Sequence, residues 1–332
     1  MKNAFATPLL KRLAPRIGVK INIEPAYRYA GQIILKNGAK RYFRGTNFDL
    51  NQLGASEIAK DKTYAAYFMR MMGYRVVQGQ AFFSKAWCAT IGSRRNRDAA
   101  YRYAKNLGFP VIVKPNSLSQ GAGVCLVYNR KEFMYAVREI EKKDRVFRIE
   151  RVAPGRDYRI VVLGREIISV YERLPLMIIG NGKSTISQLL KNKQKMFASI
   201  DRDTVIKRDD FRIGWHLKHQ GLRSSTILQK GKLITLLDNR NLSSGGDAVD
   251  VTGTLHPTFK NLALRLVRDM GLRYCGVDII VEGDITKPLN QYRILEVNAA
   301  PGIDNYAKSG LQQKRIVGGM YLKVLKAMAN MK

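Results

Sequence analysis

The chain has 332 residues, of which 58 are Lys or Arg and 26 are Asp or Glu, so its formal net charge is +32. Hydrophobic residues make up 45% of it, enough for the core of two or three lobes, and no apolar run approaches the roughly 18 residues that cross a bilayer. The first residues, interrupted by Pro8 and Pro15, lack the apolar core of a signal peptide, and the 3 cysteines are far apart. We therefore expect a globular, cytoplasmic protein without membrane contact, whose cysteines stay reduced.

The basic excess is spread along the chain rather than packed into one tail. Residues 1–60 carry eleven Lys or Arg against three acids, and residues 187–232 carry eleven against four. Such a surface attracts anions. No recognition-helix pattern, zinc-ligand spacing or aromatic RNA-binding motif accompanies the charge. This disfavours nucleic acid as the main partner and favours anionic substrates or a solvated basic surface.

In chain order, the first expected element is a hairpin around Asn37 and Gly38, in an opening region that extends to about Lys60. Helical periodicity then runs from Ser56 to Gly73, and a second helix covers RDAAYRYAKNLG. A short buried strand, a loop of small residues, a second strand and a helix follow, in FPVIVKP, NSLSQGAGV, CLVYN and KEFMYAVREIEKK.

Three further strands are predicted in VFRIERV, YRIVVLG and REIISVYER. A basic polar stretch, the loop NRNLSSGGDAVDVTG, a helix near Pro257 to Met270, two apolar strands and a closing basic helix complete the chain. The run GNGKST follows MII and opens a helix, as a phosphate loop does, but Met177 stands where that pattern requires its first glycine. We interpret the run as a structural strand-to-helix turn.

A lysine and a glycine-containing loop follow the buried strand FPVIVKP. Flexible backbone N–H groups bind anions, and a backbone without Cβ approaches them closely. Leu126 stands at the third glycine of a dinucleotide fingerprint, so that motif is absent. The residues expected to hold phosphates are Lys114, Ser119, Gln120, Gly121 and Gly123. An ordinary turn between two strands is the alternative.

Polar side chains interrupt the two apolar strands GVDIIVEG and ILEVNAAPG. Side chains two apart on a strand share a face, so Glu296 and Asn298 point the same way, while Leu295 and Val297 are expected to point into a core. With Asp278 on the preceding strand, they supply the carboxylate and amide oxygens that magnesium takes, usually together with substrate phosphates. The alternative is a solvated strand face that carries acids.

These motifs follow one another in a recognisable order: Lys62, VIVKP with its glycine loop, IERV and GRDYR, NLSSGGDAVDVT, GVDIIVEG, and ILEVNAAPG. The order resembles that of the ATP-grasp superfamily of carboxylate–amine ligases. The runs LPLMIIGNGKSTISQLL and NLSSGGDAVDVTGTLHP are similar to the ATP-grasp portion of cyanophycin synthetases and, less closely, to the glutathione-making bifunctional ligases. The match extends from about Gly54 to Gly302.

The resemblance implies an α+β fold in which ATP lies between two α+β lobes. The expected domains are a short N-terminal region at 1–60, an N-terminal ATP-grasp lobe at 61–150, a C-terminal catalytic lobe at 151–310 with a basic insert at 187–232, and a basic C-terminal helix at 311–332. The N-terminal region is shorter than the opening substrate domain of many ATP-grasp ligases.

The resemblance also implies which residues bind the nucleotide. Lys62 and Lys114 would hold phosphates, and Asp157 would hold the ribose hydroxyls. The linker residues expected to line the adenine are Glu150, Arg151 and Ala153.

The metal and catalytic residues are implied in the same way. Asp278, Glu296 and Asn298 would hold two Mg²⁺ ions, with Glu296 bridging them and Mn²⁺ as a substitute. Arg240 and Asn241 would lie near the transferred phosphate, which makes them catalytic residues together with Lys114. Gly276 stands where D-alanine ligase relatives place an arginine, and we hypothesise that Arg240 or Arg159 supplies that charge.

The activity implied is an ATP- and Mg²⁺-dependent ligase that joins an amino acid or peptide carboxylate to an amine through an acyl phosphate. The peptide substrates are expected to be acidic, and the apolar side of the closing helix makes a homo-oligomer a further expectation. Two alternatives stay open. One is a glutathione-synthetase-like or polyglutamylating ligase, and the other is a nucleotide- or nucleic-acid-binding relative that has lost ligation.

Overall fold

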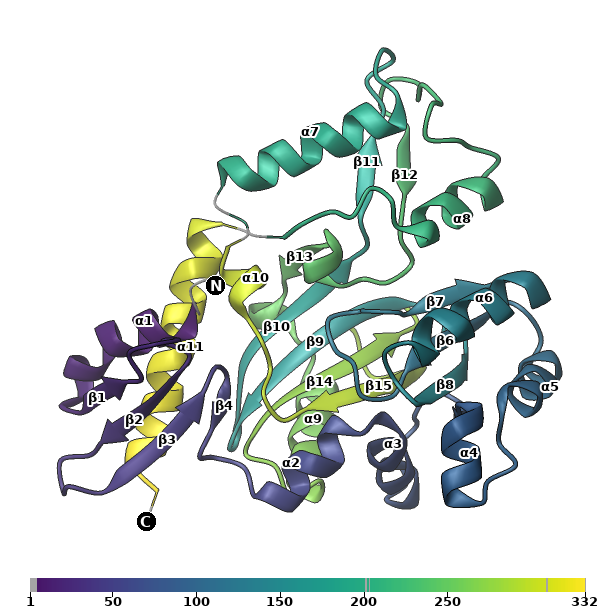
Figure 1. The fold of residues 1–332 in the computed structure, drawn as a ribbon. Helices are drawn as coiled ribbons and strands as arrows, with labels where there is room; N and C mark the ends of the chain where they lie inside the picture. The colour runs from purple at the N-terminus through teal and green to yellow at the C-terminus, as the bar shows by residue number, and fades with distance from the viewer. Residues whose placement is uncertain (1–4, 201, 203, 309, 332) are drawn as a thin grey trace.

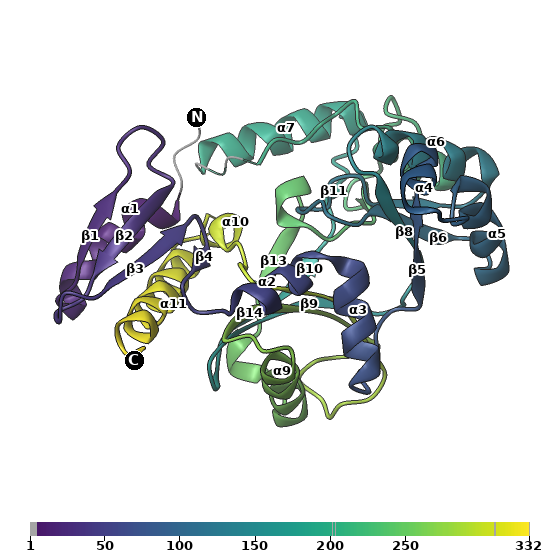
Figure 2. The same ribbon diagram turned by 60° about the horizontal axis from the view of Figure 1, so that its bottom comes forward.

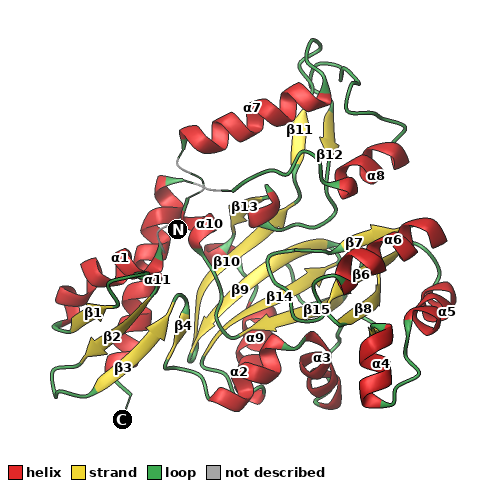
Figure 3. Ribbon diagram, in the orientation of Figure 1, coloured by secondary structure: helices red, strands yellow, loops and turns green. Residues whose placement is uncertain are grey.

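The structure is a computed structural model that describes residues 5–200, 202, 204–308 and 310–331. Its described strands form four sheets with helices packed against them, so the predicted α+β class is confirmed (Figures 1 and 3). Both views place the N-terminal sheet at one end of the molecule, the sheet of β5 to β8 at the other and the largest sheet between them (Figure 2). No helix in this described part is long and apolar enough to cross a bilayer.

The chain opens with an antiparallel sheet of strand order β1-β2-β3-β4. Its strands are β1 (Lys20–Ile23), β2 (Ala30–Ile34), β3 (Lys40–Arg44) and β4 (Asn47–Phe48). The predicted hairpin is confirmed, and Gly38 turns between β2 and β3 at a φ of 80°, which favours glycine. One face packs on the helices at both ends of the chain, namely α1 (Ala6–Leu13), the 3-10 helix η1 (Ala14–Ile17) and α11 (Leu311–Ala329).

The second sheet has the order β5-β8-β6-β7. Its strands are β5 (Gly79–Phe83), β6 (Val111–Pro115), β7 (Cys125–Val127) and β8 (Val146–Arg151). The helices of this part are α4 (Lys85–Ile91), α5 (Arg97–Leu107) and α6 (Arg130–Glu141). Alternation along β6 buries Val111 and Val113 against Phe133 of α6, so the apolar run FPVIVKP is a core strand as predicted.

The central sheet has the order β13-β10-β9-β14-β15. Its strands are β9 (Arg156–Leu163), β10 (Glu166–Leu174), β13 (Asp247–Asp250), β14 (Tyr274–Val281) and β15 (Tyr292–Asn298). The apolar cluster on one side of it includes residues of α2 (Leu53–Lys60), α3 (Lys62–Met71) and α9 (Pro257–Asp269). Figure 2 shows α9 below β9 and β14 in that view.

The prediction of a single helix from Ser56 to Gly73 is wrong, because the helix is interrupted at Asp61. Asp61 has an extended conformation, and its carboxylate accepts hydrogen bonds from the backbone N–H groups of Thr63 and Tyr64. An aspartate that caps a helix in this way starts a new helix. Lys62 is therefore the first residue of α3 rather than a residue in the middle of a helix.

The predicted insert at 187–232 lies between two short strands and contains most of two helices. Strands β11 (Met177–Ile179) and β12 (Leu233–Thr235) pair, and α7 (Ile186–Ser199) and α8 (Phe211–His219) pack over them around Leu190, Phe197 and Leu217. Thr185 forms a capping box with Gln188, which confirms that GNGKST is a strand-to-helix turn.

Two helices pack against residues outside their own predicted domains. Helix α3, within the predicted lobe 61–150, packs on the central sheet through Ala65 and Met69. Helix α11 shares its core with α1 and the N-terminal sheet. The domain boundaries stay a prediction.

Candidate active site

Opposite charges alternate across one buried face of the central sheet. Asp157 and Arg159 lie two residues apart on β9 and so share that face. Asp157 stands opposite Arg173 of β10, and Arg159 stands opposite Asp278 of β14. Asp157, Arg173 and Asp278 are all buried. The central sheet thus holds a charged cluster on the face turned away from α9.

Two arginines hold both carboxylate oxygens of Asp278. Arg159 donates from Nε to Oδ1 at 2.5 Å and from Nη2 to Oδ2 at 2.6 Å, and Arg173 donates from Nη1 to Oδ2 at 3.0 Å. Burial would raise the pKa of Asp278, but the two guanidinium groups outweigh burial and lower that pKa to about 2. Asp278 is therefore ionised at neutral pH.

Asp157 has the opposite balance, although it also contacts an arginine. Its Oδ1 accepts from Nε of Arg173 at 3.0 Å and from Nη2 at 2.7 Å. Burial outweighs this arginine, the charge of Asp278 adds to burial, and the pKa of Asp157 rises to about 6. The expected role of Asp157 in holding ribose stays a prediction, since its carboxylate is bonded to Arg173 here.

The three predicted metal ligands come together at the β14–β15 pair. Asp278 stands opposite Glu296, and Asn298 donates from Nδ2 to Oε1 of Glu296 at 3.3 Å. Leu295 lies at the register shift between the strands and is only half-buried, so its predicted place in the core is wrong, whereas Val297 is buried as predicted. The β-bulge is the reason, because it adds one residue to a strand and interrupts the alternation of faces.

These side chains fit a hard divalent cation. Two carboxylates and one amide oxygen are what Mg²⁺ takes from a protein when phosphates complete its shell. Glu296 is only partly buried, so it is accessible to such an ion. In the part of the chain that the structure describes, no three His, Cys, Asp or Glu side chains gather to hold a metal. The third protein ligand of this candidate site is therefore the amide of Asn298.

Lys62 connects the loop after β6 with the β15 carboxylate. Its Nζ donates to the carbonyl oxygens of Leu118 at 2.7 Å and Asn116 at 3.3 Å, and lies 3.7 Å from Oε2 of Glu296. Asn116 is fixed in turn, since its Nδ2 donates to Asp61 at 2.7 Å. A predicted phosphate lysine and a predicted metal ligand, which are far apart in the sequence, therefore lie side by side.

Lys114 lies in a buried ion pair rather than free in the loop. Its Nζ is 2.7 Å from Oε2 of Glu150, and Oε1 of the same carboxylate accepts from Nε of Arg148 at 2.9 Å. Burial opposes ionisation of Glu150, but Lys114 and Arg148 outweigh it and lower the pKa of Glu150. Glu150 therefore orients Lys114, and its own place beside adenine stays a prediction.

The glycine loop has a backbone that depends on left-handed residues and on contacts with the segment after β12. Gln120, Gly121 and Gly123 have φ of 59°, 69° and 71°. Ser243 donates to the carbonyl of Gln120 at 3.0 Å, and Asn239 donates to that of Gly121 at 3.2 Å. Ser119 belongs to the same loop, where its carbonyl accepts the N–H of Ala122 at 3.2 Å. A small-residue loop is thus held beside the NLSSGG segment.

The other predicted residues lie in the segment after β12 and at the end of β8. Arg240 donates from Nη1 to the carbonyl of Gly155 at 2.6 Å, and Asn241 caps the 3-10 helix η2 (Leu242–Ser244) by accepting from the N–H of Ser243 at 3.0 Å. Arg151 ends β8 with an exposed side chain, and Ala153 follows in the connection to β9. Their roles stay predictions.

Gly276 stands where D-alanine ligase relatives place an arginine, and it lies against Arg159 of the neighbouring strand β9. A Cβ built on Gly276 would lie 3.4 Å from Cδ of Arg159 and 3.0 Å from Cβ of Pro301. Of the two hypothesised replacements, Arg159 is thus beside Gly276, while the guanidinium of Arg240 is bonded to Gly155.

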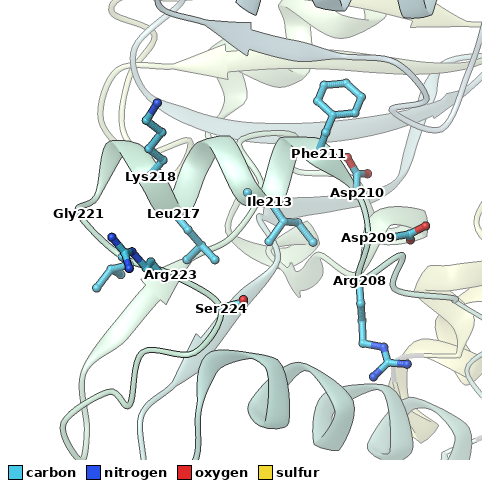
Figure 4. A pocket seen from close by; sticks show the side chains of 12 residues that line it. Arg208, Asp209, Asp210, Phe211, Ile213, Leu217, Lys218, Gly221, Arg223 and Ser224 are labelled. Atoms are coloured by element: carbon cyan, nitrogen blue, oxygen red, sulfur yellow. The ribbon is translucent and has the colours of Figure 1, made fainter.

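The insert adds a separate open cavity of about 690 Å³ beside α8 (Figure 4). Ile213 and Leu217 point into it, and Arg208 and Arg223 stand at its margins. None of the predicted site residues lines it. On another face of α8, Arg212 donates to the carbonyls of Gly121 and Val124, both at 3.0 Å, so this helix supports the glycine loop.

Sequence reasoning missed the residues that hold the site residues in place, notably Arg148, Arg173, Asp61 and Asn116. Alternation offered a signal for Arg148, which lies two before Glu150 and so shares its face. Arg173 and Asn116 carried no such signal, because their partners come from other segments.

Comparison with known proteins identifies the fold. Residues 69–182, about a third of the chain, match the family model described as D-ala D-ala ligase C-terminus. The structure aligns with a bifunctional glutathione synthetase from Pasteurella multocida at a TM-score of 0.59 and 22% identity, over 97% of this chain and 44% of that one. The chain has the ATP-grasp fold. A D-alanine–D-alanine ligase from Bacillus anthracis also aligns with it, at a TM-score of 0.50 and 15% identity, over 84% of this chain and 68% of that one.

The curated relatives include cyanophycin synthetases and glutathione biosynthesis proteins, the two groups of ligases that the motifs of this chain resemble. A cyanophycin synthetase from Geminocystis herdmanii is 36% identical over 204 residues, which are 59% of this ATP-grasp chain and 23% of that protein. A glutathione biosynthesis bifunctional protein from Clostridium perfringens is 31% identical over 225 residues, 65% of this chain and 28% of that protein. The predicted resemblance is confirmed. The chain spans about a quarter of the length of these relatives.

Proposed function

We propose that this chain is an ATP-dependent carboxylate–amine ligase. It would form an amide or peptide bond between an amino acid or peptide carboxylate and an amine, and release ADP and phosphate. The observation that carries the proposal is the position of Lys62, which bonds the glycine loop and lies 3.7 Å from Glu296. A lysine and a loop that are suited to binding phosphates thus lie beside a carboxylate that is suited to binding magnesium.

The nucleotide would use the lysines and the loop. Lys62 and Lys114 would hold its phosphates, aided by Ser119, Gln120, Gly121 and Gly123. Because Lys114 already pairs with Glu150 at 2.7 Å, it is oriented before the nucleotide arrives. The segment with Glu150, Arg151 and Ala153 would line the adenine, and Asp157 would hold the ribose.

Asp278, Glu296 and Asn298 would hold two Mg²⁺ ions, for which Mn²⁺ would substitute. These ions would supply positive charge to the phosphates of ATP. Asp278 would then divide its carboxylate between this role and Arg159, which already holds both of its oxygens. Its low pKa keeps the carboxylate ionised for that purpose.

The chemistry would proceed in two steps. A carboxylate oxygen attacks the γ-phosphorus, the bond from that phosphorus to the β–γ bridging oxygen breaks, and ADP leaves, so the carboxylate becomes an acyl phosphate. An amine nitrogen then attacks the acyl carbon, phosphate leaves, and the nitrogen loses a proton. Phosphoryl transfer depends chiefly on alignment and positive charge. Lys62, Lys114, Arg159 and Arg240 are among the residues of this chain that would supply positive charge. Asn241 would orient the groups near the transferred phosphate.

Water must be kept from the acyl phosphate. The glycine loop is suited to this, because its shape depends on left-handed residues and on side chains from outside the loop, namely Lys62, Arg212, Asn239 and Ser243. A loop of this kind closes over a substrate and excludes water.

The test is a screen of amino acid and peptide pairs for ATP-dependent phosphate release, with hydroxylamine present to trap an acyl phosphate as a hydroxamate. The screen includes γ-glutamylcysteine with glycine and glutamate peptides, because the C. perfringens relative is a glutathione biosynthesis protein. Glu296→Gln should abolish release, while Glu282→Gln, exposed just after β14, should keep it. The proposal fails if no pair releases phosphate and ATP with Mg²⁺ leaves the melting temperature unchanged.

A further inference from the structure

The insert contacts the glycine loop through Arg212 of α8, a residue outside the predicted site. Its Nη1 donates to the carbonyl oxygens of Gly121 and Val124, both at 3.0 Å. These carbonyls lie three residues apart, so a single nitrogen atom bridges the turn that contains Gly123. The N–H of Val124 closes the same turn from within, since it donates to the carbonyl of Gly121 at 3.3 Å. The turn is thus held by α8 as well as by its own backbone.

Arg212 is itself held in one orientation. Oδ1 of Asp210 accepts from its Nε at 2.9 Å, and Oδ2 accepts from its Nη2 at 2.6 Å. A contact at two points fixes the plane of a guanidinium group and leaves Nη1 for the loop. The two side chains are 16% and 10% exposed, so water competes little for the pair. Asp210 also caps α8, because it accepts from the backbone N–H of Arg212 at 3.0 Å. The start of a helix therefore presents this guanidinium to the loop.

Helix α8 is fastened to the part of the molecule that carries the loop. The rings of Phe211 and Trp215 lie edge-on to Tyr135 of α6, with centroids 4.8 and 5.4 Å away. Nε2 of His219 lies 2.8 Å from Oε1 of Glu132, also on α6. Since α6 packs on β6 and β7, the strands that the loop connects, α8 keeps a defined place beside the loop.

These contacts favour phosphate binding for two reasons. A loop that is fixed before its ligand arrives loses less conformational entropy on binding. Carbonyl oxygens carry partial negative charge, which repels phosphate oxygens, and Arg212 draws two of them into charge-assisted hydrogen bonds. The loop therefore meets an anion with its shape set and part of its negative charge offset.

We propose that Arg212 is a positioning residue for the nucleotide phosphates, and that it acts through the glycine loop. The inference rests on the proposed function and deepens it, since it gives the insert a role in setting the affinity for ATP. The alternative is a tie between α8 and the loop that stabilises the fold and has no effect specific to phosphates.

The test compares the binding of ATP and of AMP, both with Mg²⁺, by calorimetry. In Arg212→Met the Kd for ATP should rise about fivefold or more, because charge-assisted hydrogen bonds to the loop are lost. The Kd for AMP should change by less than about twofold, because AMP lacks the β- and γ-phosphates that the loop would cover. Hydrogen exchange of residues 117–124, measured without nucleotide, should be faster in the variant. The control Arg208→Met removes an exposed arginine of the same insert and should match wild type in every measurement.

Two milder variants separate position from charge. Asp210→Asn keeps a good cap for α8 but weakens the pair that orients Arg212, so the Kd for ATP should rise about threefold. Arg212→Lys keeps the charge, but one ammonium group cannot bind Asp210 at two points and also bridge two carbonyls. Its affinity for ATP should therefore stay about threefold or more below that of wild type.

Three results would overturn the inference. Arg212→Met binds ATP as tightly as wild type, or it loses affinity for ATP and AMP by the same factor, or Arg212→Lys binds ATP as wild type does. The last result would assign the effect to charge alone. A wild type that binds no ATP would overturn the proposed function and the inference with it. If wild type releases phosphate in the ligation screen while Arg212→Met keeps its affinity for ATP, the inference alone fails.

Discussion

Arg159 holds both oxygens of Asp278, with contacts of 2.5 and 2.6 Å, from a position that also covers Gly276. One side chain thus helps to keep a predicted metal ligand ionised and lies beside Gly276, where the sequence lacks an arginine. Asp278 is 1% exposed, so the pair is a buried one. Removing one partner of a buried pair leaves an uncompensated charge, which is costly.

Arg159→Met should therefore destabilise the protein by about 3 kcal/mol, since Asp278 keeps only Arg173. Urea unfolding followed by circular dichroism measures this change. The control is Arg268→Met, because the Arg268 side chain is 77% exposed and its pair with Asp269 should contribute less than about 1 kcal/mol. Equal unfolding midpoints for the two variants would show that the Arg159 pair does not stabilise the fold.

The same pair predicts a pH dependence. The folded-state pKa of Asp278 is lowered to about 2, whereas an unfolded aspartate titrates near 4. A group whose folded pKa is lowered stabilises the protein above its unfolded pKa and loses that contribution as pH falls through the folded pKa. Wild type should thus lose about 2 kcal/mol more between pH 4 and pH 2 than Asp278→Asn does. Parallel stability curves for the two proteins over that range would contradict the assignment.

Lys114 offers a test of nucleotide binding that is separate from folding. In Lys114→Gln the buried carboxylate of Glu150 still has Arg148 at 2.9 Å, so the loss of stability should stay near 1 to 2 kcal/mol. ATP affinity, measured by calorimetry with Mg²⁺, should fall at least tenfold, because the ammonium group that would bind the phosphates is removed. Lys105→Gln, an exposed lysine of α5, is the matched control and should bind ATP as wild type does. Wild-type affinity in Lys114→Gln would remove Lys114 from the phosphate site.

Gly121→Ala tests the glycine loop against a glycine of similar conformation. Gly121 and Gly92 have φ of 69° and 65°, so alanine should cost each about 1 kcal/mol of backbone strain. A Cβ at Gly121 would lie only 2.6 Å from Nδ2 of Asn239, whereas nothing lies within 4 Å of one at Gly92. Only Gly121→Ala should therefore displace the loop, which limited proteolysis would report as faster cleavage near residues 117–124. Equal cleavage of both variants would mean that the contact with Asn239 does not hold the loop.

Much of the fold was predictable from local patterns. Alternation of apolar residues in FPVIVKP predicted a buried strand, and the Asn37–Gly38 pair predicted a hairpin, because both depend on the neighbouring residues alone. The break between α2 and α3 was missed, although Asp61 was visible as a capping residue. The helix that follows GNGKST was predicted, whereas α8 was missed because its apolar face is short and lies within a strongly charged segment.

The sequence by itself determined which chemical groups this protein brings to a site: Lys62, Lys114, the glycine loop, Asp278, Glu296 and Asn298, in an order that matches the ATP-grasp ligases. Only the tertiary structure decided how those groups are paired. It placed Lys62 beside Glu296, closed Lys114 onto Glu150 and set Asp278 between Arg159 and Arg173. These pairings arise from strand register and from contacts between distant segments, which no local pattern encodes.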